Sequence, residues 1–137
     1  MPGSYLIDLD RGLVFTRAWG VLADDEIIAH AQVLRADPRF KPTFRQIANF
    51  LDTTKIILTS EAIRNLAKNN PFPRDARRAF IVTTDEAYGL ARMFMLYLDA
   101  DPQQFEIFRA MRPALEWVDL DPEMTWPSQE PDRVFGA

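Results

Sequence analysis

Carboxyl and hydroxyl side chains follow two apolar segments that we expect to be strands, at residues 45–51 and 79–82. In an open α/β sheet, ligands bind beyond the carboxyl ends of the strands, so these side chains are the first candidates for a polar site. Two predicted helix starts, one at Thr59 or Ser60 and one at Thr83, offer backbone N–H groups to an anion. The predicted polar rim comprises Asp52, Thr53, Thr54, Thr59, Ser60, Thr83, Thr84 and Asp85.

The same rim also has a simpler interpretation as a set of turn and cap residues. Asp, Ser and Thr are favoured at turns and helix N-caps, where their oxygens accept backbone hydrogen bonds. Asp52 and Asp85 would place two negative charges on the rim, which disfavours an anion there. An enzyme that uses either carboxylate as acid or base is the least favoured function, because no nucleophile–base pair is visible.

The composition excludes several kinds of chemistry. The chain of 137 residues has no cysteine and a single histidine, which rules out thiol nucleophiles, disulfides and multi-histidine metal sites. Its 5 glycines form neither a phosphate-binding loop nor a nucleophile elbow. We therefore expect no catalytic residue, no cofactor and no metal.

Charge and length narrow the class of protein further. Sixteen Lys and Arg against 20 Asp and Glu give a net charge of −4, which argues against a nucleic-acid partner. The length fits one domain. The sequence shows no apolar run of about 18 residues and no basic-then-apolar start, so we expect a cytoplasmic protein.

His30 and a group of arginines are the remaining charged candidates. His30 falls beside the apolar stripe of a predicted helix, where we expect a partly buried side chain rather than a general base. Arg74, Arg77 and Arg78 form a basic cluster that suits acidic lipid head groups. Such a cluster is more often a solvated loop, and Asp75 partly neutralises this one.

Hydrophobic periodicity and cap residues predict the elements that position these groups. The second strand is expected to end at Gly20, and the caps of three helices are expected at Asp24, at Thr59 or Ser60, and at Thr83. Strands are predicted at residues 5–9, 13–19, 45–51, 79–82 and 105–108, with helices at residues 24–36, 60–68, 84–98 and 113–118.

The resulting order, β-β-α-β-α-β-α-β-α, predicts an α/β fold. A short turn joins the first two strands as an antiparallel hairpin, and a helix joins each later strand to the next. Right-handed crossovers then place helices on the faces of a mixed, mostly parallel five-stranded sheet. We expect one domain over residues 1–121. The Pro-rich tail at residues 122–137 is expected to be disordered or to lie on another surface.

The predicted helix over residues 87–98 is apolar on every side. Its expected inner stripe is Ala87, Leu90, Ala91, Phe94 and Leu98. A helix that is apolar all round is usually buried, so we expect something to cover its outer face. That outer surface comprises Tyr88, Arg92, Met93, Met95, Leu96 and Tyr97.

Four candidates can cover this helix. They are a second copy of the chain, the tail with Trp126 and Phe135, a lipid-like ligand, and a membrane surface. Methionines suit a surface that adapts to a partner. The plain alternative is a wide core stripe with scattered exposed apolar side chains.

Several segments give the chain a resemblance to the SpoIIAA-like proteins, which are related in fold to the STAS domains of anti-sigma-factor antagonists. The segments are YLI (5–7), LVFTRAWG (13–20), RQIA (45–48), LTSEAI (58–63), RRAFIV (77–82) and AYGLARMF (87–94). The resemblance spans residues 5 to 118 and implies a small regulatory or ligand-associating domain, with lipid or membrane association in the SpoIIAA-like branch.

The phosphorylated serine of STAS domains has a partial counterpart here. An Asp-Ser-Ser-Gly type motif opens the matching helix in that family, and this sequence has Leu58, Thr59, Ser60 and Glu61 instead. Glu61 would repel a phosphate on either hydroxyl. An N-cap role is the favoured interpretation.

The sequence therefore favours binding over catalysis. The leading hypothesis is a regulatory domain that forms a homodimer through the helix at residues 87–98 or contacts a regulatory protein. The alternative is a carrier or sensor of an apolar small molecule or lipid, held between that helix and the sheet, with peripheral membrane contact.

Overall fold

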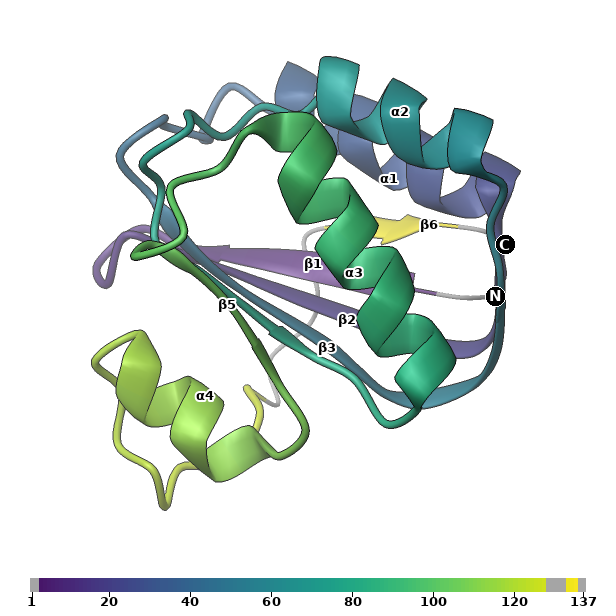
Figure 1. Ribbon diagram of the computed structural model, residues 1–137. Coiled ribbons are helices and arrows are strands. Elements are labelled where there is room, and N and C mark those ends of the chain that lie inside the picture. Colours follow the sequence, from purple (N-terminus) through teal and green to yellow (C-terminus); the bar gives the residue numbers. More distant parts are fainter. Residues whose placement is uncertain (1–2, 128–132, 136–137) are drawn as a thin grey trace.

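The computed structural model describes residues 3–127 and 133–135 as a sheet with helices on both faces (Figure 1). The order of elements along the chain matches the predicted one, with one further strand at the end. The elements are β1 (Gly3–Asp8), β2 (Leu13–Ala23), α1 (Asp24–Ala36), β3 (Arg45–Ile57), α2 (Ser60–Lys68), β4 (Arg78–Ile81), α3 (Asp85–Leu98), β5 (Phe105–Phe108), α4 (Met111–Trp117) and β6 (Arg133–Phe135).

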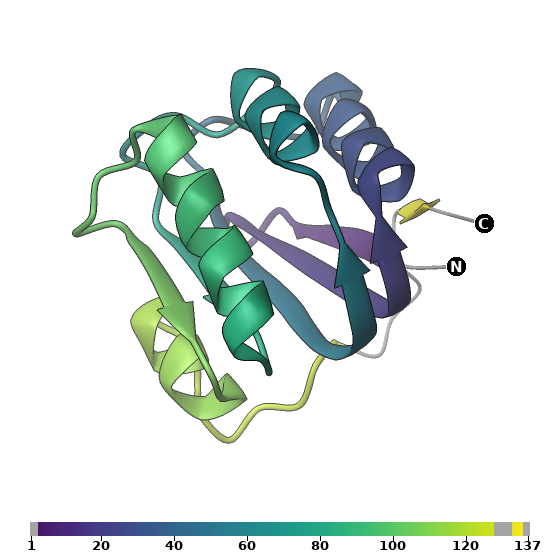
Figure 2. The same cartoon turned by 45° about the vertical axis from the view of Figure 1, so that its right-hand side comes forward.

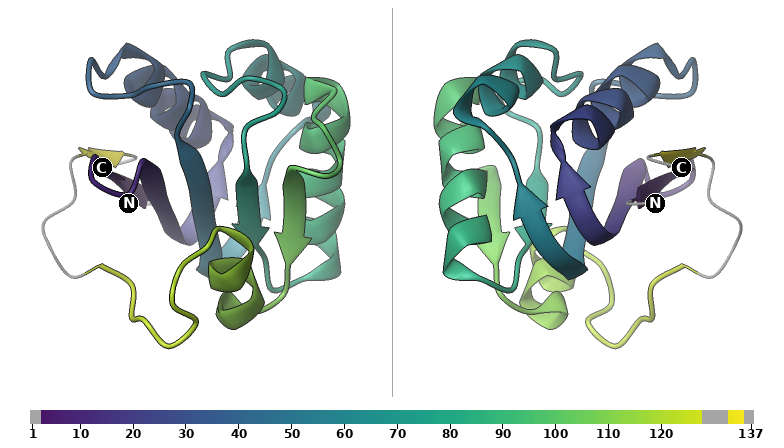
Figure 3. Two further views of the ribbon diagram at one scale, coloured as in Figure 1. Left: turned by 90° about the vertical axis from the view of Figure 1, so that its left-hand side faces the viewer. Right: turned by 90° about the vertical axis from the view of Figure 1, so that its right-hand side faces the viewer.

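The sheet has the order β5-β4-β3-β2-β1-β6. Strands β2, β3, β4 and β5 run parallel to one another, and β1 is antiparallel to both β2 and β6. Helices α1, α2 and α3 cover one face, and α4 covers the other (Figures 2 and 3). The predicted α/β fold with a mixed, mostly parallel sheet is confirmed.

Side chains alternate along the strands between two apolar layers. On the face covered by α4, Phe15, Ile47 and Ile81 pack against Leu115 and Val118. On the other face, apolar side chains of β2, β3 and β4 pack against α1 and α3. This second layer positions the candidate site.

Strands β2 and β3 extend further than the sequence predicted. The two pair in parallel as far as Ala23 opposite Ile57, so residues 52–54 continue a strand instead of ending one. Gly20 does not end β2 either. It has a φ of +66° and lies between two register shifts, so it bends the strand without breaking the pairing.

Two helix caps differ from the prediction by one residue. Ala23 precedes α1, and its backbone N–H donates to Glu26 Oε2 at 2.8 Å. Thr84, rather than Thr83, caps α3 by accepting from the Ala87 N–H at 3.0 Å. The predicted Thr59 cap of α2 is confirmed by its 3.1 Å bond from the Ala62 N–H.

The described part of the C-terminal tail lies away from α3. The ring of Trp126 meets Phe15 edge to face at 5.3 Å between centroids, on the sheet face that α4 covers. Strand β6 pairs with β1, and its residue Phe135 lies opposite Gly3. The suggestion that Trp126 covers α3 is therefore wrong, and the rest of the tail prediction falls on residues 128–132 and 136–137, outside the described part.

Two glycines give opposite expectations for the same substitution. Gly20→Ala places a Cβ in the left-handed region and should lower the free energy of unfolding by about 1 kcal/mol. Gly89→Ala adds a methyl group in open space on α3 and should raise it by about 0.5–1 kcal/mol. Urea denaturation of the two variants checks this, and a stabilising Gly20→Ala would contradict the assigned bend.

Candidate functional site

The structure separates the residues of the predicted polar rim. Asp52 lies in β3, where Arg17 Nη2 donates to its carboxylate at 2.8 Å. Asp85 is fully exposed at the start of α3 and accepts from Arg109 Nη2 at 2.7 Å. Neither carboxylate borders either of the two cavities described below, so these cavities lend acid–base chemistry by Asp52 or Asp85 no support.

Two hydroxyls of the rim, those of Thr53 and Thr84, serve local backbone structure. Thr53 Oγ1 donates to the Phe50 carbonyl at 2.6 Å, and Thr84 caps α3. Thr54, Thr83 and Ser60 are exposed. None of the eight rim residues borders either cavity described below.

Thr59, the counterpart of the STAS phosphorylation motif, is already engaged. Its Oγ1 donates to Asp24 Oδ2 at 2.8 Å while it accepts from the Ala62 N–H. Its backbone N–H donates to Asp24 Oδ1 at 3.0 Å. A phosphate on Thr59 would face the Asp24 carboxylate, so these contacts support the N-cap interpretation.

The three arginines before β4 do not form one solvated loop. Arg74 is exposed and pairs with Asp99 at 3.4 Å. Arg77 lies over the ring of Trp117, 3.8 Å from its centroid, and its Nε donates to the Trp117 carbonyl. Arg78 points the other way and is buried, with 5% exposure. The two interpretations of a single basic cluster are both wrong for Arg78.

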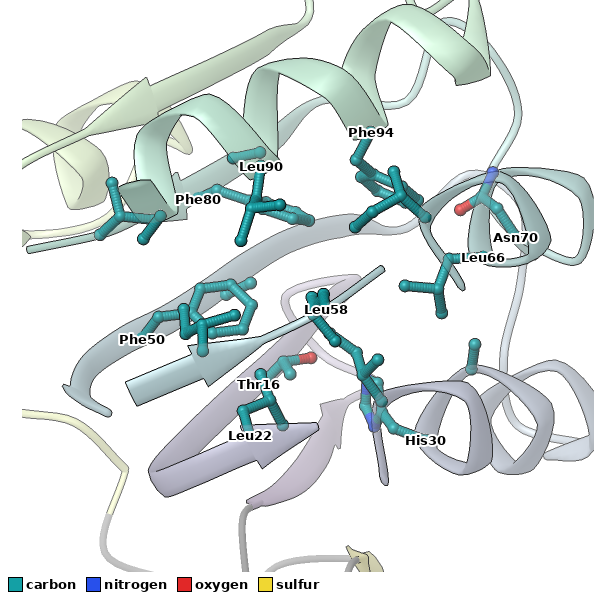
Figure 4. A pocket seen from close by; sticks show the side chains of 18 of the residues that line it. Thr16, Leu22, His30, Phe50, Leu58, Leu66, Asn70, Phe80, Leu90 and Phe94 are labelled. Carbon is teal, nitrogen blue, oxygen red and sulfur yellow. The ribbon is translucent and has the colours of Figure 1, made fainter. Parts of the chain in front are cut away.

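A cavity of about 100 Å³, open on one side, lies between α3 and the sheet. We call it the α3 crevice. Figure 4 shows Leu90 and Phe94 reaching into it from α3, opposite side chains of the strands and of α1 and α2. Its apolar lining includes Leu22, Phe50, Leu58, Leu66, Phe80, Leu90 and Phe94.

A chain of polar side chains crosses the sheet beneath the α3 crevice. Gln46 Nε2 donates to Thr16 Oγ1 at 3.1 Å, and Gln46 Oε1 accepts from Arg78 Nε at 2.9 Å. Arg78 Nη1 in turn donates to Asn70 Oδ1 at 3.0 Å. Thr16, Gln46 and Arg78 come from β2, β3 and β4, so adjacent strands bring them together. All four also line the crevice.

His30 lies further inside than its helix position predicted. It is buried with 8% exposure, lines the α3 crevice, and meets the ring of Tyr5 edge to face at 5.6 Å. Burial, with the positive charge of Arg78 as a second cause, lowers the pKa of His30 to about 3. The imidazole is therefore neutral at pH 7.

A second cavity, of about 230 Å³, also borders Arg78 and Asn70. Its lining includes Ala67, Pro73 and Arg74. The guanidinium of Arg78 thus borders both the apolar α3 crevice and this second, more polar cavity.

The outer face of α3 is only partly covered. Leu96 has 67% exposure and Tyr97 has 44%, whereas Tyr88, Met93 and Met95 are half-buried. Arg64 of α2 donates to the Tyr97 hydroxyl at 3.2 Å, and Arg109 lies over the ring of Tyr88. Arg92 is exposed. These six residues were predicted as one surface, and their exposure is uneven.

Sequence analysis assigned no role to Thr16, Gln46 or Asn70, and it considered Arg78 only as part of a basic cluster. The available signal was alternation: Gln46 shares a strand face with Ala48 and Phe50, and Arg78 shares one with Phe80 and Val82. A polar residue in phase with buried apolar neighbours is a candidate for a buried polar group.

The protein has an α/β fold of the SpoIIAA-like type. It is similar to the crystal structure of an uncharacterized protein of the DUF3478 family, with a SpoIIAA-like fold, from Shewanella loihica PV-4, at a TM-score of 0.50. The match covers 77% of this chain and 83% of that chain at 18% sequence identity. No protein-family model and no curated protein matches the chain. The predicted resemblance in fold is confirmed.

Two further observations concern the described residues alone. No helix among them has the length and apolar character needed to cross a bilayer. No three of their His, Asp or Glu side chains come together as a metal site.

The buried His30 should make stability depend on pH. The unfolded chain takes up a proton near pH 6.5, and the folded chain takes it up only near pH 3. As the pH falls between these values, the free energy of unfolding should decrease by about 1.4 kcal/mol per unit from this group. His30→Gln should flatten the slope, measured by urea denaturation between pH 6.0 and 4.5.

Asp37→Asn is the matched control for His30→Gln. A hydrogen bond from Arg39 holds the pKa of Asp37 well below its usual range, so its stabilisation is lost only below about pH 4. The slope between pH 6.0 and 4.5 should survive in Asp37→Asn. An equal slope in His30→Gln and the unchanged protein would contradict the assignment.

Proposed function

We propose that this protein binds a small apolar molecule in the α3 crevice. The observation that carries this proposal is the position of the inner stripe of α3. Leu90 and Phe94 are directed at the sheet, yet they are only half-buried because the crevice lies in front of them. Covering them would remove apolar surface from water, which is worth about 25 cal/mol per Å².

The size and lining of the α3 crevice support a ligand with an apolar body. Its volume of about 100 Å³ approaches that of an engineered apolar protein cavity of about 150 Å³ that admits benzene. The open side allows a longer ligand to extend toward solvent. Apolar walls with a few fixed polar groups are typical of small-molecule sites.

Binding, rather than catalysis, is the role that these contacts support. The polar side chains beneath the crevice donate to and accept from one another, and His30 is neutral at pH 7. Such a set fixes the orientation of a ligand.

A pair of α1 variants tests where an apolar ligand binds. Ala31 lines the α3 crevice, and Ala29, on the same helix, does not. Ala31→Leu adds three carbons to the lining and should weaken binding of 1-octanol at least fivefold, because a filled cavity cannot accept the chain. Ala29→Leu should leave the affinity unchanged. NMR titration of the Leu90 and Phe94 side chains gives both values.

The proposal also predicts which ligands the unchanged protein binds. Neutral alcohols from butanol to decanol should shift the Leu90 and Phe94 signals, with affinity that increases with chain length. If none of these alcohols binds, or if Ala31→Leu and Ala29→Leu behave alike, the crevice is not the ligand site.

Self-association through α3 is a second candidate function. The observation that favours it is the exposure of Leu96 and Tyr97 beside the half-buried Met93 and Met95. A two-fold interface would place this face of α3 against its own copy and remove it from water.

A charge introduced on the outer face of α3 tests self-association separately from ligand binding. Leu96→Asp should convert a dimer into a monomer, because an unpaired carboxylate would be buried in the interface. Leu9 has 57% exposure and lies in the β1–β2 turn, distant from Leu96 in the sequence. Leu9→Asp should therefore leave the dimer intact. Light scattering at micromolar concentration measures both, and a monomeric unchanged protein would remove this function.

A further inference from the structure

Arg78 is the one fully charged side chain that lines the α3 crevice in the described part of the chain. It begins β4 between Gln46 of β3 and Phe105 of β5, so it lies in the interior of the sheet. Its exposure is 5%. Removing a whole charge from water is costly unless a partner compensates for it.

The hydrogen bonds of Arg78 use only part of its capacity. Nε donates to Gln46 Oε1 and Nη1 donates to Asn70 Oδ1, at 2.9 and 3.0 Å. A guanidinium has five N–H donors, so these two bonds leave three for a further acceptor. Gln46 and Asn70 hold the guanidinium in one orientation. Each is itself held by a hydrogen bond, Gln46 to Thr16 and Asn70 to the Phe72 carbonyl.

Four aromatic rings lie near the guanidinium. Its carbon lies 4.3 Å from the ring centroid of Phe72 and 5.4 Å from those of Phe80, Phe94 and Phe105. Cation–π contacts stabilise a cation, but they supply no negative charge. Burial lowers the pKa of Arg78 to about 9, so the side chain still carries its charge at pH 7.

No described carboxylate balances this charge. Arg78 has no ion pair with an Asp or Glu of the described chain, and neither cavity that it borders has an acidic residue in its lining. His30, on the same crevice, is a base. Neutral oxygens and rings satisfy the donors of a buried cation without neutralising it. The crevice is therefore matched to a single negative charge.

We propose that the ligand of the α3 crevice is a monocarboxylate with an apolar body. Its carboxylate accepts from the N–H groups of Arg78 that Gln46 and Asn70 leave available, and its body lies against Phe80, Leu90 and Phe94. A carboxylate is favoured over a phosphate monoester, which carries about −1.5 to −2 at pH 7 and would exceed the one available cation. This inference rests on the proposed apolar binding and adds the charge of the ligand.

Four probes of equal chain length test the head group on the unchanged protein. Octanoate should bind at least tenfold more tightly than 1-octanol at pH 7, octyl phosphate should bind more weakly than octanoate, and octylamine should not bind. The same NMR titration of Leu90 and Phe94 gives each affinity. If octanol binds as tightly as octanoate, the proposed carboxylate ligand is contradicted but the proposed apolar site is not. If no probe binds, both proposals are contradicted. Tighter binding of octyl phosphate assigns a phosphate head instead.

Arginine variants locate the head group. Arg78→Met removes the charge and keeps an unbranched side chain, so octanol should then bind more tightly than octanoate. Arg77→Met is the matched control, because the neighbouring Arg77 lies over Trp117 on the other face of the sheet. It should keep the preference for octanoate. Arg78→Lys retains a cation and should also keep that preference. It provides a second variant at this position if Arg78→Met does not fold. Unchanged preference in a folded Arg78→Met overturns the assignment.

Discussion

The parallel pairing of β2 with β3 is the constraint on which the rest of the structure depends. The pairing continues to Ala23 opposite Ile57, whereas β3 meets β4 only from Gln46 to Asn49. The two long strands therefore pass the end of β4, as Figure 2 shows. α1 and α2 begin at this extended edge, and α3 begins directly after β4. The helices consequently start at different levels over the sheet. The α3 crevice lies in the space that the helices leave uncovered, and Leu22 and Ile56 of the extended strands form part of its lining.

The crevice combines an apolar lining with one buried charge. Thr16, Gln46 and Arg78 lie side by side across three strands, and their hydrogen bonds fix the guanidinium within a ring of phenylalanines. A buried network of this kind is costly when it is incomplete, so under the proposed function its geometry would discriminate among ligands. The apolar surface would supply binding free energy that is not specific to one molecule, and the charge would supply the discrimination.

The apolar composition of α3 has two separate consequences in the fold. Its inner residues Leu90 and Phe94 line the crevice, and its outer residue Leu96 faces solvent. A ligand and a second copy of the chain would therefore use different faces of the same helix, and the two proposed functions do not compete for surface. The polar rim, by contrast, is divided: Asp52 and Asp85 contact arginines, and Thr59 and Thr84 cap helices.

Local sequence patterns determined the elements and their order. The bounds of α1 at residues 24–36 and of β5 at 105–108, and the Thr59 cap of α2, follow from periodicity and cap chemistry, and the alternation of strands and helices fixes the class of fold. Only the tertiary structure decided how far β2 and β3 pair, that Asp52 lies within a strand, and that His30 and Arg78 are buried. Periodicity reports the environment that a segment needs, whereas burial of a polar side chain depends on partners such as Thr16 and Gln46, which are distant in sequence. The α3 crevice depends on the same long-range register, and for that physical reason no local pattern predicts it.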